Sequence, residues 1–193
     1  MQKKKRSYSR IGFVIAATGL AGTTVSSLKE LRENNLEMLR LRDAVISADE
    51  SGIEITERLA ELQLHVTTHM NATPPKLGSE PAIQLKNSYD RAKLVEQTRV
   101  SAERTAIAND ATIYCEENFR TALLSVRADC VARYVADRPV EERTIVADLY
   151  RYDFVSPRWS PDAAGWSIVI AIFFALTLAV LLASKIIAIL RLK

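Results

Sequence analysis

An uncharged apolar stretch near the C-terminus, Trp166–Ser184, constrains this chain more than any other feature. Its nineteen residues (WSIVIAIFFALTLAVLLAS) would form a helix of roughly 28 Å, which matches the hydrocarbon core of a bilayer. Uncharged apolar stretches of this length are typical of transmembrane helices. The sequence therefore predicts a membrane span, which we assign to residues 165–185.

A second uncharged segment, Ile11–Leu28, lies near the N-terminus but contains three Gly and five Ser or Thr residues. Two interpretations stay open. It is a retained transmembrane anchor (residues 11–28), which we favour, or a secretory signal cleaved after Gly19-Leu20-Ala21. Small residues at four-residue spacing favour an anchor helix that packs closely against Trp166–Ser184. These are Gly12 with Ala16, and Gly22 with Ser26.

Charge is distributed unevenly along the chain. Residues 1–28 carry five basic side chains and 165–193 carry three, without any acid, whereas 29–164 carry 18 basic and 23 acidic side chains. Positively charged flanks stay on the cytoplasmic side of a membrane. We therefore expect a cell-membrane protein with a basic cytoplasmic N-terminus (1–10), a basic cytoplasmic tail (186–193) and an extracytoplasmic helical domain between the spans. Anionic lipid headgroups account for the basic ends, so we expect no nucleic-acid partner.

The extracytoplasmic domain begins with a long helical pattern. The sequence has neither Gly nor Pro from Thr23 to Glu50, and apolar residues then recur at helical spacing up to Met70. A continuous helix from Leu28 to Met70 would measure about 65 Å. Ser51-Gly52-Ile53-Glu54 fits a capping box, which leaves open a break at Gly52.

A turn and a returning helix follow. The segment Asn71–Ser79 contains two Pro and one Gly, which is typical of a turn. The next helix is expected to start at Ser79 or Glu80, with Pro81 in its first turn, and to reach Tyr114. It carries a narrow stripe of small and apolar residues: Leu85, Tyr89, Ala92, Val95, Ala102, Ala106 and Ile113. The pattern predicts an extended, coiled-coil-like antiparallel hairpin.

The two cysteines of the chain, Cys115 and Cys130, lie fifteen residues apart in the segment assigned outside the cytoplasm. Thiols oxidise in such compartments, so we expect a structural disulfide that closes the base of the hairpin. The alternative is a pair of buried free thiols. Two ligands are too few for structural zinc.

Aromatic residues are concentrated just before the second span. Pro157 and Pro161 exclude a regular helix there. Tyr and Trp favour the membrane–water interface, so residues 150–165 are predicted to form a collar at the outer membrane surface. Ordinary packing under the helices is the alternative. The interface residues are Tyr150, Tyr152, Trp159 and Trp166, together with Phe154.

Three segments carry a resemblance to known sequences: Tyr152–Trp166 (YDFVSPRWSPDAAGW), Leu64–Asn71 (LHVTTHMN) and Ala128–Val131 (ADCV). With these segments the chain resembles an uncharacterised family of small two-span membrane proteins of candidate-phylum, Saccharibacteria-like bacteria. The resemblance extends from about Leu41 onward. It implies the two-span topology and the paired cysteines, and it transfers no catalytic residue.

One cluster has the spacing of a metal site. Glu61, His65 and His69 lie at positions i, i+4 and i+8, and two His at this spacing can share a metal ion. The pattern lacks the Glu that metalloproteases carry between the two His, and a further ligand would have to come from the opposite helix. A packed or pH-sensitive histidine at the hairpin tip is the alternative. We therefore expect no cofactor.

The sequence as a whole predicts an all-α protein in which two transmembrane helices flank the helical ectodomain. It contains no Ser–His–Asp arrangement, phosphate loop or cleft of paired carboxylates, so we expect a protein that is not an enzyme. The favoured function is a cell-envelope component that assembles with itself or another membrane protein through its ectodomain. The alternative is a sensor or ligand-binding ectodomain that signals through a partner membrane protein.

Overall fold

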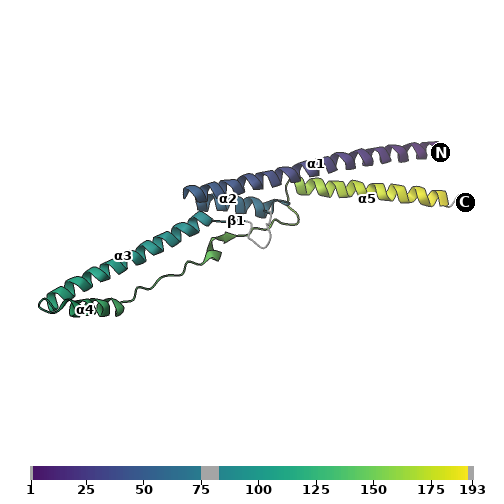
Figure 1. The fold of residues 1–193 in the computed structure, drawn as a ribbon. Coiled ribbons are helices and arrows are strands. Elements are labelled where there is room, and N and C mark those ends of the chain that lie inside the picture. Colours follow the sequence, from purple (N-terminus) through teal and green to yellow (C-terminus); the bar gives the residue numbers. More distant parts are fainter. Residues whose placement is uncertain (1, 75–82, 191–193) are drawn as a thin grey trace. The chain divides into compact units, whose positions relative to one another are not determined.

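The computed structural model describes residues 2–74 and 83–190, and this part of the chain is mostly helical (Figure 1). The all-α prediction is confirmed. The elements in chain order are α1 (Gln2–Ser51), α2 (Ile55–Thr68), β1 (Ile83–Gln84), α3 (Lys86–Asn118), α4 (Leu124–Ala136), the 3₁₀ helix η1 (Ala147–Tyr150), β2 (Arg151–Tyr152) and α5 (Ala163–Leu190).

Two of these helices are long and apolar enough to cross a membrane. They cover Ile11–Ser51 of α1 and Ala163–Leu190 of α5. The chain divides into two compact units: α1, α2 and α5 belong to one, and Gln84–Arg151, with α3, α4 and η1, forms the other. Strands β1 and β2 pair in a two-stranded sheet.

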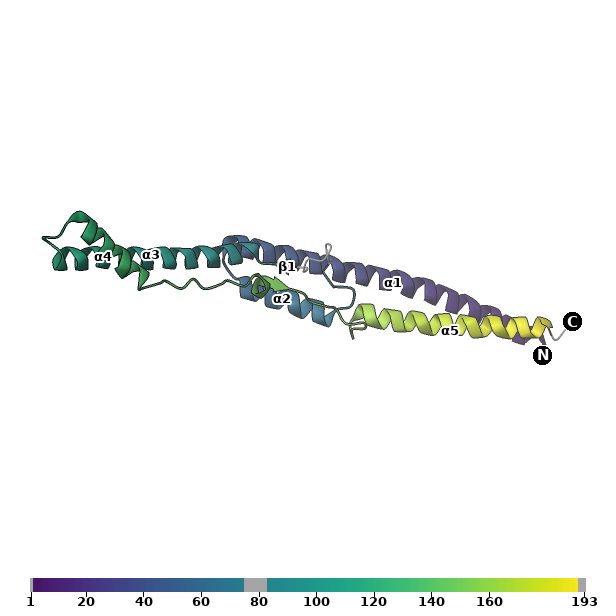
Figure 2. The same ribbon diagram turned by 60° about the horizontal axis from the view of Figure 1, so that its bottom comes forward.

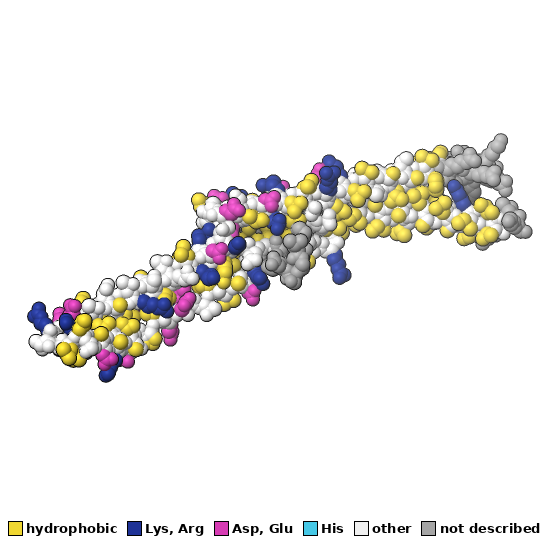
Figure 3. Space-filling model, in the orientation of Figure 1, with side chains coloured by type: hydrophobic (Ala, Val, Ile, Leu, Met, Phe, Trp, Pro, Cys, Tyr) yellow, Lys and Arg dark blue, Asp and Glu magenta, His cyan; other side chains and the backbone are white. Residues whose placement is uncertain are grey.

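Helices α1 and α5 lie side by side and run antiparallel. The N-terminal end of α1 therefore lies beside the C-terminal end of α5 (Figures 1 and 2). Lys185 Nζ lies 4.7 Å from the centre of the Phe13 ring at this end. At the opposite end, Ser27 Oγ donates a hydrogen bond to Ser167 Oγ over 3.0 Å. Hydrophobic side chains cover the visible face of the pair (Figure 3).

The face of α1 that contacts α5 is only partly the predicted one. Ala16 is 2% exposed, and Ser27 is also buried. Gly22 and Ser26, however, are exposed, and no atom lies within 4 Å of a Cβ built at Gly22. Residues three and four positions apart lie on the same face of a helix. The face of α1 that contacts α5 contains Ala16, Gly19 and Ser27. The predicted pair Gly22 and Ser26 is therefore wrong as a packing surface.

Helix α1 does not continue into α2, because the chain reverses between them. Gly52 has φ 76° and Glu54 has φ 57°, so both residues adopt the left-handed conformation that ends helices. Helix α2 then packs back along α1 (Figure 2), and buried apolar side chains line both helices: Met38 and Val45 on α1, Leu62 and Val66 on α2. The continuous helix of about 65 Å predicted up to Met70 is wrong, and the break at Gly52 is real.

The predicted capping box is also wrong. Ser51 is the last residue of α1, and its Oγ accepts a weak hydrogen bond of 3.4 Å from Ile53 N. Glu54 precedes α2 without a capping hydrogen bond from its side chain, which instead pairs with Arg58 at 2.8 Å. The sequence Ser51–Glu54 fits the capping-box pattern, but the left-handed turn prevents the two side chains from forming the reciprocal hydrogen bonds of a capping box.

In the unit Gln84–Arg151, α3 begins at Lys86. The predicted start at Ser79 or Glu80 lies outside the described residues, and Ile83–Gln84 is a strand, so the helix starts later than predicted. Helix α4 packs against α3, and the extended segment 139–146 leads from α4 to η1, which also contacts α3. The buried residues of α3 are Glu96, Val100, Ala111 and Cys115.

Candidate functional site at the start of α5

Three segments of the first unit meet in a polar cluster just before α5. We call this cluster the α5-entry junction: Asn34 on α1, His65 on α2, His69 directly after α2, and Ser160 and Asp162 before α5. Asn34 Nδ2 donates to Asp162 Oδ2 over 3.1 Å and lies 3.5 Å from Met70 O. Ser160 is fully buried, donates to Asp162 Oδ1 over 2.8 Å and accepts from Met70 N over 3.1 Å.

Asp162 caps the start of α5. Its Oδ1 accepts a hydrogen bond of 2.9 Å from Gly165 N, which would otherwise have no partner in the first turn. Burial raises the pKa of Asp162, but the hydrogen bonds from Gly165 N, Ser160 and Asn34, with the charge of His69, outweigh it and leave the pKa below its ordinary value. The carboxylate is therefore charged at the positive end of the helix dipole.

Gly165 permits the close approach of the junction to α5. A Cβ at this position would lie 1.8 Å from Ser160 O, a distance that no side chain can accept. The backbone of α5 therefore packs directly against the segment that holds Asp162. This contact fixes the direction in which α5 leaves the junction.

The two histidines stack against each other at this junction. Their ring centres lie 4.5 Å apart with an angle of 22° between the planes. His65 Nε2 lies 3.0 Å from Asn34 O, and His69 Nδ1 lies 3.1 Å from His65 O. A carbonyl oxygen only accepts hydrogen bonds, so His65 Nε2 donates to Asn34 O, whereas His69 Nδ1 also lies 3.0 Å from the Thr68 hydroxyl.

Glu61, His65 and His69, which were weighed as metal ligands because of their spacing, are not gathered around one point. Glu61 pairs with Arg58 at 3.0 Å, and the described residues contain no group of three His, Cys, Asp or Glu side chains that could hold a metal ion. One nitrogen of each histidine is already committed to a carbonyl. The expected position at a hairpin tip is wrong, because the reversal at Gly52 brings His65 and His69 to the start of α5.

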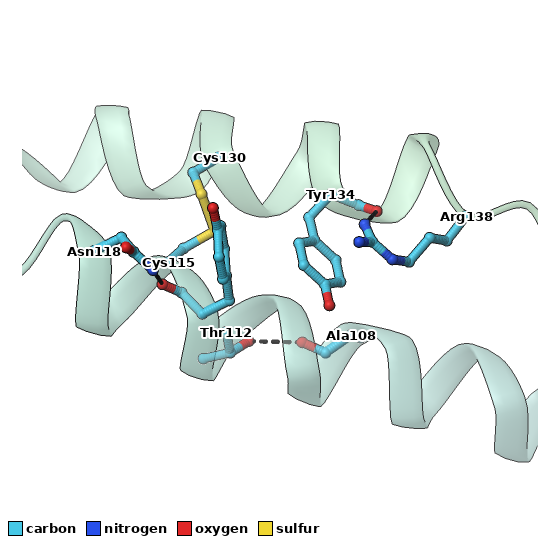
Figure 4. The surroundings of a disulfide bond; sticks show 8 residues. Ala108, Thr112, Cys115, Asn118, Cys130, Tyr134 and Arg138 are labelled. Carbon is cyan, nitrogen blue, oxygen red and sulfur yellow. Dashed lines mark hydrogen bonds between the residues drawn. A yellow bond between two sulfur atoms is a disulfide. The ribbon is translucent and has the colours of Figure 1, made fainter.

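The disulfide Cys115–Cys130 is present and joins α3 to α4 (Figure 4). The two Cα atoms are 6.0 Å apart, and no described cysteine is free. The ring of Tyr134 lies 5.4 Å from that of Tyr114 on α3, and the guanidinium of Arg138 lies 3.6 Å above the Tyr134 ring. The bond is thus accompanied by aromatic contacts that hold the same two helices together.

A second polar contact holds the extended segment 139–146 on α3. The Glu96 side chain is only 9% exposed and receives hydrogen bonds of 2.7 Å from Arg99 Nη2 and Arg143 N. The hydrogen bond from Arg99, followed by that from Arg143, lowers the pKa of Glu96 to about 2. Arg99 also donates to Glu141 O over 2.7 Å. Glu96 is therefore a buried anchor for the chain that returns from α4.

The predicted interface aromatics divide between the two units. The rings of Trp159 and Trp166, which flank Asp162 in the sequence, pack edge to face with their centres 5.9 Å apart. Both side chains are about half exposed. Tyr152 contacts Phe154 at 6.3 Å. Tyr150 instead packs edge-on against Tyr89 of α3 at 5.6 Å, which is the ordinary packing that the sequence left as the alternative.

Sequence patterns did not single out Asn34, Ser160 or Asp162. A recognisable signal existed, since Ser160-Pro161-Asp162 directly precedes an apolar helix and Asp is a preferred helix-capping residue. Asn34 carried no local signal, because its partners Met70 and Asp162 are distant in sequence. Only the folded chain identifies it.

No family model matches the chain, and the comparisons with curated proteins and with solved structures give no match. The resemblance to the two-span bacterial family stays a prediction.

Proposed function

We propose that this protein is a non-enzymatic membrane component of the cell envelope that assembles through its unit Gln84–Arg151, with a second copy of itself or with another membrane protein. The observation behind this proposal is an exposed, uncharged face of α3 that does not include the buried residues of that helix. It consists of Val95, Thr98, Ala102, Thr105, Asn109 and Thr112, all of which are exposed.

The spacing of this face suits a second helix. Its residues recur at intervals of three and four, the spacing of a coiled-coil seam, and most are small enough to allow close approach. The hydroxyls of Thr98, Thr105 and Thr112 donate to backbone carbonyls four residues earlier over 2.8, 2.8 and 2.9 Å. Burial of these threonines against another helix would therefore leave no hydroxyl without a partner.

Helix α4 adds apolar surface to the same unit. It has no buried residue among those the structure describes, and Leu123 and Leu124 at its start are 76% and 75% exposed. Exposed apolar residues in such number favour a partner surface. Residues 84–151 carry eleven basic and eleven acidic side chains, so net charge does not oppose association between copies.

The proposal includes the two-span topology with both termini in the cytoplasm. Its support is that the N-terminal end of α1 and the C-terminal end of α5 lie together (Figure 1), and that both sequence ends are basic. The unit Gln84–Arg151 would then lie outside the cytoplasm.

Site-specific crosslinking in native membranes tests the assembly. Thr105→Cys places a free thiol on the proposed seam, and Arg104→Cys places one off the seam, beside Val100 and Glu142, as a matched control. A short bis-maleimide should yield a crosslinked dimer, or a crosslink to one other membrane protein, with Thr105→Cys only. Exclusively monomeric chains with both variants would contradict the proposal, and Ala102→Glu should abolish the crosslink.

A sensor ectodomain is the second candidate. It is favoured by an open groove of about 600 Å³ beside the disulfide, where aromatic and charged side chains converge. The groove is lined by Tyr114, Phe119, Val126, Asp129, Cys130, Arg133, Tyr134, Asp137 and Arg138. A ligand that stabilises the purified protein thermally, but not the Tyr134→Ala variant, would support this function. A broad ligand screen without any shift would count against it.

A further inference from the structure

We propose that two copies of this protein bind each other antiparallel along α3, in a two-fold symmetric contact that pairs Arg91 of each copy with Glu116 of the partner subunit. The inference rests on the assembly proposed above and deepens it, because it names the partner as a second copy and gives the direction of the two helices. It follows from the order of the side chains along the exposed face of α3.

The uncharged face of α3 continues by one position at each end, and these two positions carry opposite charges. Arg91 lies four residues before Val95, Glu116 lies four residues after Thr112, and both side chains are exposed. We call the complete row the α3 seam. It consists of Arg91, Val95, Thr98, Ala102, Thr105, Asn109, Thr112 and Glu116, at alternating steps of four and three residues.

The α3 seam is available to a partner over its whole length. From Arg91 to Glu116 it measures about 37 Å along the helix. It lies on the side of α3 away from the buried residues Glu96, Val100 and Ala111. A second helix can therefore approach it without displacing the segments that cover those residues.

A second copy that runs in the opposite direction brings every seam position level with another seam position. Arg91, Val95, Thr98 and Ala102 then lie level with Glu116, Thr112, Asn109 and Thr105 of the partner subunit, in that order. The two-fold symmetry of such a contact repeats each pair once.

The charges at the two ends decide the direction. In the antiparallel pair, Arg91 meets Glu116 of the partner subunit at both ends of the contact, and opposite charges attract. In a parallel pair, Arg91 would meet Arg91 of the partner subunit and Glu116 would meet Glu116 of the partner subunit, so like charges would repel at both ends. The antiparallel direction is therefore favoured.

The polar layer of the seam is complementary in the same direction. Thr98 Oγ donates its proton to Leu94 O over 2.8 Å, so its lone pairs remain to accept a hydrogen bond. The side-chain amide of Asn109 of the partner subunit lies level with it and has N–H donors. Burial of this layer would thus leave both side chains with a partner.

Apolar side chains at the two ends of α3 also match only in the antiparallel pair. Leu94 and Val95 are 63% and 70% exposed at one end. At the other end, Thr112 lines a small pocket together with Leu124 of α4, which is 75% exposed. Antiparallel pairing brings these two groups together, whereas a parallel pair would keep them about 26 Å apart along the helix.

Cysteine crosslinking of the full chain in mild detergent micelles, where both directions are accessible, tests the pairing. The native cysteines are disulfide-bonded and do not react with a short bis-maleimide. A mixture of Thr98→Cys and Asn109→Cys chains should form a crosslinked dimer, because the two thiols lie level. Each variant alone should form none, because its two thiols lie about 16 Å apart along the helix.

Charge reversal gives an independent measurement. Arg91→Glu or Glu116→Arg should weaken dimerisation by about fivefold or more, since each creates two like-charge pairs. The double variant should restore dimerisation to within about twofold of the wild type, because it recreates both ion pairs. Glu117→Arg is the matched control, since Glu117 is exposed but lies outside the seam, and it should have no effect. Energy transfer between labelled copies measures the dissociation constant.

The outcomes separate this inference from the assembly on which it rests. Crosslinks with Thr98→Cys alone and with Asn109→Cys alone would show a parallel pair and overturn the antiparallel contact, while assembly through α3 would stand. Equal effects of Glu116→Arg and Glu117→Arg would also overturn it. Thr105→Cys should crosslink in either direction, since its two copies lie within about 5 Å of the same level. A purely monomeric Thr105→Cys chain would refute the assembly and this inference together.

Discussion

Gly19 of α1 lies directly against the ring of Phe174 of α5, so that a Cβ at position 19 would be 2.6 Å from a ring carbon. This contact sets how closely the two apolar helices approach. Gly22, one turn further on, has no neighbouring atom within 4 Å of a Cβ. The two glycines therefore make a matched pair for testing the packing of α1 on α5.

Gly19→Leu should weaken the α1–α5 pair, because the added side chain occupies the position of the Phe174 ring. Overpacking of this kind costs about 1–3 kcal/mol. Reversible unfolding in mixed micelles should show the loss for Gly19→Leu and little change for Gly22→Leu. Equal stability of the two variants would mean that the close contact does not hold the helices together.

Replacement of both Cys115 and Cys130 by Ser should destabilise the unit Gln84–Arg151 by about 2–4 kcal/mol without affecting membrane insertion. The bond restricts the unfolded chain between α3 and α4, and its loss removes that restriction. Denaturant unfolding with and without reductant measures the effect, and the double variant should be insensitive to reductant. Alkylation of both thiols in the native, non-reduced protein would contradict the prediction.

Glu96 should make the stability of its unit depend on pH in the acid range. Its pKa is about 2 in the folded chain against an ordinary value of 4.5, so the folded state favours the charged form. The resulting stability is complete above the ordinary pKa and is lost as the pH falls from about 4.5 towards 2.

Glu96→Gln should therefore flatten the dependence of the unfolding midpoint on pH across this window. Glu103→Gln is the control, since Glu103 also pairs with Arg99, at 2.6 Å, but its side chain is half exposed. The control should keep most of the wild-type slope. If both variants have the same slope as the wild type, Glu96 is not the titrating anchor.

Single cysteines at Ser7 and Leu192, in a background lacking the native pair, should be labelled only from the cytoplasmic side. Basic flanks stay inside, and both positions belong to the basic ends of the chain. A membrane-impermeant maleimide applied to intact and to opened cells distinguishes the sides. Labelling at either position in intact cells, or a mature chain lacking residues 1–21, would refute the topology with two retained spans.

The sequence alone determined the features that depend on local composition. The absence of charge over Trp166–Ser184 was sufficient to predict an apolar helix, since its length and hydropathy are properties of the segment itself. The helical class followed from the same kind of local pattern. The two cysteines lie close in sequence, and the expected pairing of Cys115 with Cys130 is present in the structure.

Only the tertiary structure decided which surfaces meet. A periodic pattern shows that a helix has a distinct face, but it does not identify the element that covers this face. The sequence therefore indicated Gly22 and Ser26 as residues that pack against α5, whereas the contact is made by Gly19. One reversal at Gly52, with φ 76°, moved His65 and His69 from an expected hairpin tip to the start of α5. The α5-entry junction joins residues more than a hundred positions apart, such as Asn34 and Asp162, and such contacts arise from the direction of the chain rather than from local preference.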